Sequence, residues 1–585
     1  MDAAITAKRL EISGVVQGVG FRPFLFGLAK RYHLKGEVSN TSAGVLVTVE
    51  GSPKNIEDFT SDIYSKSPLL ARVTHIEVFD AEIRNFSLFQ IVKSQSSFKQ
   101  TTLISPDVSI CSDCLAEMKD ANDRRYEYPF INCTNCGPRY TIIEDIPYDR
   151  PKTSMKRFKM CDQCRQEYDD PLDRRFHAQP NACPECGPGV FLTDNKGQRI
   201  DSTSEDAIGL AARFLSQGKI VGVKGLGGFH LACDASNQNA VQDLRQKKTR
   251  PHKPFALMAE SASALFDHVH VSPLEKQILE SYHRPIVLLK KKRVSRDMIL
   301  VPAADVAPFN TCLGVMLPYT PVHFLLLEKG PDILVMTSGN RSGEPLSIEN
   351  EDALDSFSHI ADYFLLHNRD IYFRADDSIV RVQRDRQRFI RRSRGYAPLP
   401  VSLNKTMPKI LACGAGLKNT ICLTRGHHAF LSQHIGDLEN GMVNDYFQST
   451  IGHVKKIFDI HPDIIAHDMH PAYKSTDYVG AQKGVKKIAV QHHHAHAAAC
   501  MAENDLDEKV IAITLDGTGY GTDGHIWGGE ILLCTHEKFN RKAHLSYIKM
   551  PGGDAAVLEP WRMAASVLSQ AFGNDFLNLD IPYIK

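Results

Sequence analysis

The spacing of apolar and polar residues changes several times along the chain and divides it into segments. Residues 7–92 follow the order strand, helix, strand, strand, helix, strand, which is typical of a small split βαβ domain. From about residue 201, helical periodicity alternates with β-branched runs, beginning with the helix DAIGLAARFLSQ and the strand GKIVGVKGLGGFHLACDA. This alternation predicts an α/β domain.

The last segment repeats one unit. After the linker PLPVSLNKTMP, the stretch KILACGAGLKNTICLTRGHHAFLSQHIGDLE predicts three strands with a glycine loop between the first two. The stretch KVIAITLDGTGYGTDGHIWGGEILL, which begins at residue 509, repeats this arrangement. A duplicated three-strand unit with a polar glycine turn is typical of the actin-like ATPase fold, in which both turns face a nucleotide. The residues expected in the two turns are Gly414, Gly416 and Lys418, then Asp516, Gly517 and Gly519.

Eight of the fourteen cysteines form four C-x2-C pairs, and the second two pairs repeat the first two at a displacement of fifty residues. Two thiolates on a tight turn supply half of a tetrahedral site, and a second pair completes it. The spacing therefore predicts two structural zinc ions, each closed by four sulfurs. The ligands would be Cys111, Cys114, Cys133 and Cys136, and Cys161, Cys164, Cys183 and Cys186.

Composition places the chain among ordinary globular proteins, with 43% hydrophobic and 23% charged residues and a net charge of +1. Aspartates stand beside the arginines of the cysteine segment, so we do not expect nucleic-acid binding. No apolar run of eighteen residues and no signal peptide is present, which predicts no membrane span. Paired thiols without an export signal predict the reducing cytoplasm.

A glycine-rich turn follows the first strand and predicts an anion-binding cradle, because successive backbone N–H groups converge there. Arg22 at its edge can clamp a phosphate or carboxylate, and Asn40 on the next strand can orient a water. The strings GVVQGVGFRPF and GEVSNTSAGVLVTVEG resemble the acylphosphatase family. The resemblance implies a ferredoxin-like domain in which Arg22 binds an acyl phosphate and Asn40 positions the attacking water. The cradle residues are Gln17, Gly18, Val19, Gly20 and Phe21.

The third segment places cations, small hydroxyls and glycine turns at strand ends, as a triphosphate site requires. Its motifs KTRPHKPFALM, TSGNRSGEP, DDSIVR and RRSRG resemble the YrdC-like family. That family has a twisted α/β fold and uses ATP, which we expect with Mg²⁺, to adenylate a carbamate. No Walker A motif is present, which argues against a P-loop kinase. The residues implied to hold the nucleotide are Lys248, Arg250, Ser338 and Asn340, followed by Lys224, Lys253 and Arg392.

The stretch VQHHHAHAAACMAE predicts a helix that carries His492 and His496 on one face, four residues apart. Two imidazoles on one helical turn suit a metal ion, and Asp516 is the candidate third ligand. The segment resembles the Kae1-like carbamoyltransferase family, which implies a further zinc or iron ion at this site. That family continues beyond the point that corresponds to Lys585, so we expect a partial Kae1-like domain and a truncated chain, and the sequence leaves open whether this chain completes the final transfer step.

The order of the four resemblances is that of the HypF family of hydrogenase maturation carbamoyltransferases. The resemblance implies hydrolysis of carbamoyl phosphate, formation of carbamoyl-AMP from ATP, and carbamoyl transfer to the C-terminal cysteine of HypE. Carbamate and acyl adenylates decompose in water, so enclosed transit between the sites is expected. The predicted domains are 1–95 (acylphosphatase-like), 105–195 (double zinc finger with four cysteines per site), 200–396 (YrdC-like) and 406–585 (Kae1-like).

Two alternatives remain open from the sequence. A threonylcarbamoyl synthase or transferase acting on tRNA would share the last two domains but would give the acylphosphatase-like segment no role. A zinc-scaffolded binding protein with vestigial sites would bind no nucleotide at all.

Overall fold

The computed structural model separates into two compact units, each described below by itself. The first unit comprises Met1–Pro400, Leu417–Leu423 and Phe430–His461, and the second comprises Val401–Gly416, Thr424–Ala429 and Pro462–Lys585. The residues described are 5–16, 19–41, 44–68, 70–92, 103–146, 148–203, 205–292 and 302–581.

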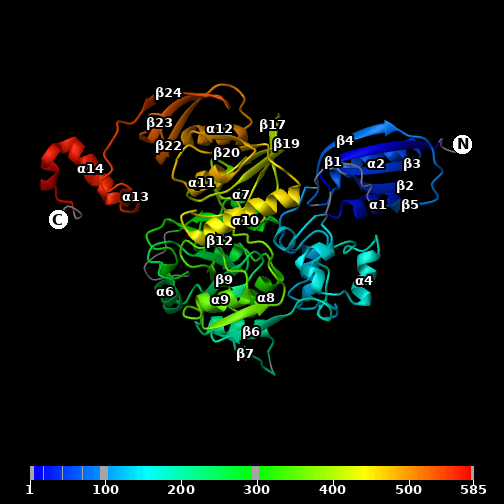
Figure 1. The fold of residues 1–585 in the computed structure, drawn as a ribbon. Helices are drawn as coiled ribbons and strands as arrows, with labels where there is room; N and C mark the ends of the chain where they lie inside the picture. Colours follow the sequence, from blue (N-terminus) through cyan, green and yellow to red (C-terminus); the bar gives the residue numbers. More distant parts are fainter. Residues whose placement is uncertain are drawn as a thin grey trace. The chain divides into compact units, whose positions relative to one another are not determined.

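The N-terminal domain has the predicted order of strands and helices (Figure 1, blue). Its five-stranded sheet has the order β4-β1-β3-β2-β5, in which β5 is a short strand beyond the predicted six elements. Both helices bury apolar faces, and α2 begins with a Ser52 cap and Pro53 at its first position. The elements are β1 (Thr6–Val15), α1 (Phe21–Arg31), β2 (Lys35–Thr41), β3 (Gly44–Gly51), α2 (Pro53–Ser65), β4 (Arg72–Asp80) and β5 (Phe89–Ile91).

The cysteine-rich segment forms two zinc modules, here called the first zinc module (103–146) and the second zinc module (148–189). Each contains one eight-residue helix that starts directly after the first cysteine of its quartet, so the helices are also displaced by fifty residues. The buried cysteines of the first module belong to the same hydrophobic cluster as residues of the large sheet. The elements are α3 (Ser112–Lys119), η1 (Tyr140–Ile142), η2 (Arg150–Lys152), η3 (Ser154–Arg157) and α4 (Asp162–Asp169).

An eleven-stranded sheet forms the centre of the first unit, with the order β16-β15-β11-β12-β10-β13-β9-β8-β14-β6-β7. Its inner strands are buried on both faces because helices cover them, which explains their nearly continuous apolar sequences. Its strands are β6 (Val190–Asp194), β7 (Arg199–Ile200), β8 (Val221–Lys224), β9 (Phe229–Asp234), β10 (Ala256–Ala259), β11 (Ile286–Lys290), β12 (Cys312–Met316), β13 (Ile333–Ser338), β14 (Tyr363–His367), β15 (Ile379–Gln383) and β16 (Arg386–Arg391).

Short helices and 3-10 turns connect these strands, and the predicted glycine-rich turn joins β8 to β9 as an antiparallel pair. We refer to residues 190–400 as the nucleotide-binding domain, after the function that its sequence motifs predict. Its helical elements are α5 (Ala207–Ser216), α6 (Gln238–Lys247), η4 (Ser263–Leu265), α7 (Pro273–Glu280), η5 (Ala304–Val306), α8 (Pro321–Lys329) and α9 (Asn350–Phe357).

Helix α10 (Gly441–Phe458) also belongs to the first unit, although the sequence places it in the last segment. The Tyr446 hydroxyl donates a 3.0 Å hydrogen bond to the Arg374 carbonyl. The Tyr140 hydroxyl donates a 2.7 Å hydrogen bond to Gln433 Oε1. Buried polar contacts therefore fix residues 430–461 on the nucleotide-binding domain and the first zinc module.

The second unit contains two sheets, of orders β17-β19-β18-β20-β21 and β22-β23-β24. The expected linker is instead strand β17, which pairs with β19. The prediction of three strands within residues 409–439 is wrong, because this stretch contains two strands, β18 and β19. The strands are β17 (Val401–Met407), β18 (Ile410–Ala412), β19 (Cys422–Leu431, whose two ends are grouped with the first unit), β20 (Ile464–Asp468), β21 (Lys486–Val490), β22 (Val510–Tyr520), β23 (Ile526–Cys534) and β24 (Phe539–His544).

The second predicted three-strand unit is confirmed as β22-β23-β24, but its glycine turn is a bulge inside β22. The register passes from Leu515 opposite Gly529 to Gly519 opposite Trp527, so extra residues of β22 project from the ladder. No helix within the described ranges is both long enough and apolar enough to cross a bilayer. The helical elements are α11 (Lys474–Ala481), α12 (His492–Glu503), α13 (Ala555–Leu558), α14 (Pro560–Phe572) and η6 (Gly573–Asn578).

Candidate functional site

Each predicted cysteine quartet converges on one point. Neighbouring Sγ atoms lie 3.5–3.8 Å apart in the first quartet and 3.6–3.8 Å apart in the second. A disulfide would bring two sulfurs to about 2.05 Å, whereas a tetrahedron with Zn–S bonds of about 2.3 Å separates them by about 3.8 Å. The donor atoms therefore fit zinc, and both quartets are closed structural sites.

Arginines connect the two zinc modules reciprocally. Arg124 of the first module donates to Cys164 Sγ at 2.8 Å, and Arg174 of the second donates to Cys114 Sγ at 3.0 Å. The adjacent arginines form crossed ion pairs, in which Arg125 Nη1 lies 2.9 Å from a Glu167 carboxylate oxygen and Arg175 contacts Glu117. Each quartet is thus neutralised partly by the opposite module, which makes the pair one structural element.

The pKa values of these arginines show that their charges are balanced. Burial alone would lower the pKa of Arg174, but the Cys114 thiolate and the Glu117 carboxylate outweigh it and raise the pKa. Burial also acts to lower the pKa of Arg124, but Cys183, Cys164 and Glu167 outweigh this effect and raise the pKa. From the sequence, these arginines were interpreted only as surface charge. Arg124 and Arg174 are fifty residues apart, as are the corresponding cysteines, and this shared spacing could have indicated that they contact the zinc sites.

The acylphosphatase-like site includes Arg22 and Asn40, which lie on α1 and β2. Burial lowers the pKa of Arg22, against the raising influence of Asp149 and Tyr168. Within the described residues, no side-chain oxygen accepts a hydrogen bond from Arg22, and the buried Asn40 Oδ1 has no partner. Both groups therefore retain their capacity to bind a ligand.

The cradle is described only in part, because Gln17 and Gly18 lie outside the described residues. Val19 and Phe21 are buried, and Gly20 has φ 71° and caps α1. A Cβ on Gly20 would lie 2.9 Å from Thr134 Oγ1, inside the second C-x2-C loop of the first zinc module. The cradle thus packs against a zinc-held loop, and only glycine permits this approach.

Four of the predicted nucleotide-binding residues meet at the end of β13. Lys248 Nζ donates to the Asn340 carbonyl at 3.0 Å and also to the Ser338 carbonyl. The Ser338 hydroxyl donates to Asn340 Oδ1 at 2.7 Å. Arg250 Nη1 donates to Thr337 Oγ1 at 3.2 Å. The cations contact neutral oxygens only, so their positive charge remains available to an anion.

Burial, together with neighbouring cations, depresses the pKa values in this cluster. The pKa of Lys248 is lowered to about 7 by burial and by Arg250 and Lys253. Burial lowers the pKa of Arg250 to about 10, and Arg245 and Arg391 add to this effect. The pKa of Lys253 is lowered mainly by burial as well. A group of buried cations without carboxylate partners is typical of a site for a polyanion.

His434 was not singled out from the sequence, yet it belongs to the surroundings of this cluster. Burial lowers its pKa to about 4, helped by Arg391 and opposed by Asp376 and Asp437. Arg391 forms an ion pair with Asp376. The sequence carries little indication of this position, because Asp376 and Arg391 lie more than 40 residues before His434.

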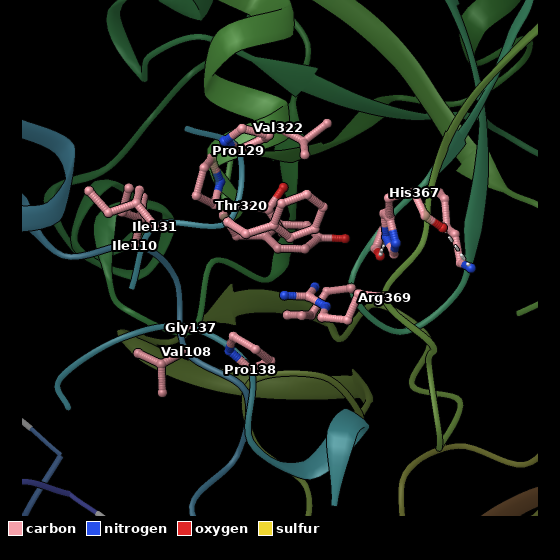
Figure 2. Close-up of a pocket in the computed structure, with 16 residues that line it drawn as sticks. Val108, Ile110, Pro129, Ile131, Gly137, Pro138, Thr320, Val322, His367 and Arg369 are labelled. Carbon is pink, nitrogen blue, oxygen red and sulfur yellow. Dashed lines mark hydrogen bonds between the residues drawn. The ribbon is translucent and has the colours of Figure 1, made fainter. Parts of the chain in front are cut away.

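Of the three weaker predictions for this site, Lys224 and Arg392 donate hydrogen bonds to residues outside this group of four. Lys224 Nζ donates to Asn350 Oδ1 at 2.8 Å and to the His367 carbonyl at 3.3 Å. Arg392 donates to the carbonyls of Tyr396 and Leu399 at 3.0 and 2.6 Å. Arg392 therefore holds the chain before β17. Lys224 lines a separate cavity, shown in Figure 2.

In the second unit, His492, His496 and Asp516 meet as predicted. Asp516 Oδ2 lies 2.9 Å from His492 Nε2 and 3.7 Å from His496 Nε2, without hydrogen-bond geometry to either ring. Two imidazoles and one carboxylate are donors that suit zinc or iron. Asp468, which the sequence reading missed, contacts His492 Nδ1 at 2.6 Å and fixes the ring so that Nε2 faces Asp516.

The expected second nucleotide site is distributed over several turns. Gly414 has φ 67°, and a Cβ on Gly416 would contact the Tyr473 ring at 3.3 Å. A Cβ on Gly519 would lie 2.5 Å from the His493 ring, so this glycine accommodates the histidine helix. Gly517 lies in the β22 bulge beside Asp516, and its N–H donates to that carboxylate. Lys418, with φ 47°, is grouped with the first unit.

Comparison with known protein families gives matches to successive segments of the chain. Family profiles match as acylphosphatase (8–91), HypF finger (110–143 and 160–193), the Sua5/YciO/YrdC family described as telomere recombination (213–393), HypF Kae1-like domain (405–503), and carbamoyltransferase, Kae1-like domain, second subdomain (512–582).

Relatives match over almost the whole chain. Carbamoyltransferase HypF2 of Cupriavidus necator is 45% identical over 96% of this chain and 71% of its own length. Carbamoyltransferase HypF of Synechocystis is 46% identical over 97% and 73%. A crystal structure of full-length HypF in the phosphate- and nucleotide-bound form is 48% identical, with TM-score 0.92 over 100% of this chain and 76% of that one. The HypF structure of T. kodakarensis gives 42% and 0.89, over 99% and 74%.

An acylphosphatase-like domain, two thiolate zinc sites and an α/β nucleotide-binding domain define a multidomain group-transfer enzyme. The family matches also cover the Kae1-like segments, residues 405–503 and 512–582. The chain belongs to the HypF carbamoyltransferase family. Neither the tRNA-modifying alternative nor the vestigial binding protein is favoured, because the matched carbamoyltransferases include the N-terminal domain and the zinc fingers.

Proposed function

We propose that this chain converts carbamoyl phosphate into a carbamoyl adenylate and serves in carbamoyl transfer to HypE during [NiFe]-hydrogenase maturation. The observation that carries the proposal is the presence, in one compact unit, of two sites whose cations lack anionic partners. One is the Arg22–Asn40 site, and the other is the cluster of Lys248, Arg250, Ser338 and Asn340.

At the first site, the Arg22 guanidinium would bind the phosphate oxygens of carbamoyl phosphate, together with the N–H groups of the cradle. Asn40 would orient the water that attacks, and carbamate and inorganic phosphate would leave. The buried, unpartnered Asn40 Oδ1 supports this role. The zinc-held loop beside Gly20 would help to exclude bulk water from the product.

At the second site, a carbamate oxygen would attack the α-phosphorus of ATP, and pyrophosphate would depart. Lys248 and Arg250 would stabilise charge on the triphosphate, while Ser338 and Asn340 would add hydrogen bonds. Lys253 is close enough to influence both cations and would contribute to the same field. Mg²⁺ would accompany the nucleotide as its counter-ion.

The final step would join the carbamoyl carbon to the C-terminal cysteine thiolate of HypE and release AMP. A metal ion at His492, His496 and Asp516 would supply Lewis-acid stabilisation of charge. Asp468 would hold the His492 ring, and the glycine turns at Gly414, Gly416, Gly517 and Gly519 would contact nucleotide. The resulting thiocarbamate would be the precursor of the cyanide ligands. Thiolate zinc sites favour a reducing compartment, so we place this chemistry in the cytoplasm.

The decisive experiment measures pyrophosphate release from ATP that depends on carbamoyl phosphate, in the unaltered chain and in Arg22→Ala. We expect release in the unaltered chain, at least about 100-fold less in the variant, and recovery when fresh ammonium carbamate is added. Arg31→Ala, which changes an exposed arginine of the same helix, is the matched control and should behave as the unaltered chain. Release that ignores carbamoyl phosphate would contradict the proposal.

A further inference from the structure

A partly enclosed cavity lies in the first unit, between the first zinc module and the ends of β8 and β14 (Figure 2). Its walls are mostly apolar, and three basic side chains, Lys224, His367 and Arg369, reach it from the nucleotide-binding domain. The cavity measures about 30 Å³ in the space open to the centres of water-sized groups. About 10–15 Å³ on this scale holds one water, so the cavity has room for one group of a few heavy atoms.

Arg369 is the most unusual of the three. Its residue is 7% exposed, and within the described part of the chain its guanidinium donates no hydrogen bond; Nε is buried without a partner. Figure 2 shows the guanidinium among the lining residues. It stacks on the Phe130 ring, 4.9 Å from the centroid, but a ring face does not satisfy its N–H groups.

The neighbouring groups do not neutralise this charge. Tyr128 and Asp107 act on Arg369 through space, but neither forms an ion pair or hydrogen bond with it among the described residues. Asp107 Oδ1 accepts from two backbone N–H groups, and its Oδ2 is buried without a hydrogen-bond partner. Burial consequently lowers the pKa of Arg369 to about 10, and that of Lys224 to about 8. An isolated buried guanidinium is strongly unfavourable, so the site is incomplete without an anion.

The remaining donors and acceptors restrict the identity of that anion. His367 Nε2 lies 3.3 Å from the Gly225 carbonyl and burial favours the neutral ring, while its Nδ1 is buried without a partner. A guanidinium binds a planar carboxylate through two parallel N–H groups, and the aromatic and proline walls suit a flat, thin ligand. The small volume favours an anion of few heavy atoms over a nucleotide.

We propose that this cavity binds a small planar carboxylate-type anion, of the class of carbamate and bicarbonate, with Arg369 as its receptor. The proposal deepens the proposed function, because carbamate is the product of the first reaction and the substrate of the second. Lys224 and Asn350 hold the cavity wall, and loops of the first zinc module close it. Besides its structural role, the first zinc module would therefore complete the wall of this anion site.

Binding is tested directly by thermal unfolding of the full chain in potassium bicarbonate, formate or nitrate at constant ionic strength. Each planar anion is expected to raise the Tm by about 1–3 °C at saturation, and sulfate is the non-planar comparison. The rise should disappear in Arg369→Met and remain in Arg213→Met, which changes an exposed arginine of α5. Equal shifts with all anions, or a shift that persists in Arg369→Met, would leave only ordered water in the cavity and overturn the proposal.

A second measurement separates this site from the proposed reactions. In Arg369→Met, phosphate release from carbamoyl phosphate should be unchanged, while carbamoyl-phosphate-dependent pyrophosphate release should fall at least about tenfold. Arg369→Lys, which retains the charge but loses the fork geometry, should show an intermediate loss and guards against a folding defect. The proposal is wrong if both activities fall together or neither changes.

The outcomes of the two measurements are distinguishable. Absence of pyrophosphate release from the unaltered chain would refute the proposed function, yet the anion-dependent Tm shift and its loss in Arg369→Met would still establish the site. Conversely, normal pyrophosphate release with no planar-anion shift would preserve the proposed function and eliminate this cavity as an anion site.

Discussion

Two arginines of the zinc modules and two cations of the nucleotide-binding domain, all buried or partly buried, have opposite kinds of hydrogen-bond partner. In the zinc modules, Arg125 meets the Glu167 carboxylate and Arg174 meets the Cys114 thiolate, so anions outweigh burial and raise the pKa values. In the nucleotide-binding domain, Lys248 and Arg250 donate only to neutral oxygens, and burial lowers their pKa values to about 7 and about 10.

This difference separates structural charges from charges that await a ligand. A buried cation whose partner belongs to the protein contributes to folding, and removing either partner leaves the other without compensation. A buried cation without such a partner reduces stability until an anion binds. The direction of the pKa shift follows the charge of the acceptor, whereas burial is common to all four cations, Arg125, Arg174, Lys248 and Arg250.

The largest effect is expected when a zinc quartet is broken. Cys114→Ser removes one ligand of the first site and the acceptor of Arg174. Structural zinc contributes about 10–16 kcal/mol in finger peptides, so we expect the first zinc module to unfold and the zinc content to fall to about one ion per chain. Elemental analysis and near-ultraviolet circular dichroism would measure both.

Cys500→Ser is the matched control, since Cys500 is exposed and belongs to neither quartet. It should retain about two zinc ions and the native spectrum. A Cys114→Ser chain that also retains both ions would show that three thiolates suffice, and would weaken the distinction between closed and ligand-receiving sites.

The quartets could be predicted because spacing in the chain determines which thiolates share a turn, and the fifty-residue repeat supports the pairing. The contacts of Arg124 and Arg174 across the two modules could not be predicted, because they depend on how one module packs on the other. The fifty-residue repeat of these arginines indicated a shared role but did not identify the cysteines that they contact. The same limit applies to Asp468, which is 24 residues from His492 and reaches it only through the pairing of β20 and β21.

The nucleotide-binding cluster was predicted from motif resemblance, and four of its residues are brought together at β13. Lys224 and Arg392 donate to other residues, and these contacts could not be predicted because the direction of a side chain at a strand end depends on the sheet order. The β22 bulge at Asp516 was read as a turn because glycines mark both kinds of irregularity. Arg369 carried no sequence signal, as an arginine after a strand is common on exposed loops.

An intermediate effect is expected when one paired arginine is removed. Arg125 is almost fully buried, and Arg125→Met leaves the Glu167 carboxylate without its main partner. Loss of one member of a buried pair costs about 3–5 kcal/mol, so urea unfolding should show a decrease of that size. Arg250→Met is the comparison: stability should be unchanged or higher, while ATP affinity falls about 10–100-fold. Equal destabilisation by both variants would contradict the distinction drawn here.

The smallest effect is a pH dependence of nucleotide affinity set by Lys248. Its pKa is lowered to about 7 in the free protein, mainly by burial and further by Arg250 and Lys253. A bound triphosphate favours the charged amine and raises this pKa, so binding above pH 7 takes up a proton. Affinity should therefore be highest at and below pH 7 and fall as the pH rises, by at most about tenfold per pH unit for one proton.

Calorimetry in two buffers of different ionisation enthalpy measures the proton uptake, and Lys248→Met should bind nucleotide weakly with no such dependence between pH 7 and 9. An affinity that stays constant over this range in the unaltered chain would mean that Lys248 keeps its proton without a ligand, and that a hidden anion already compensates it as Glu167 compensates Arg125.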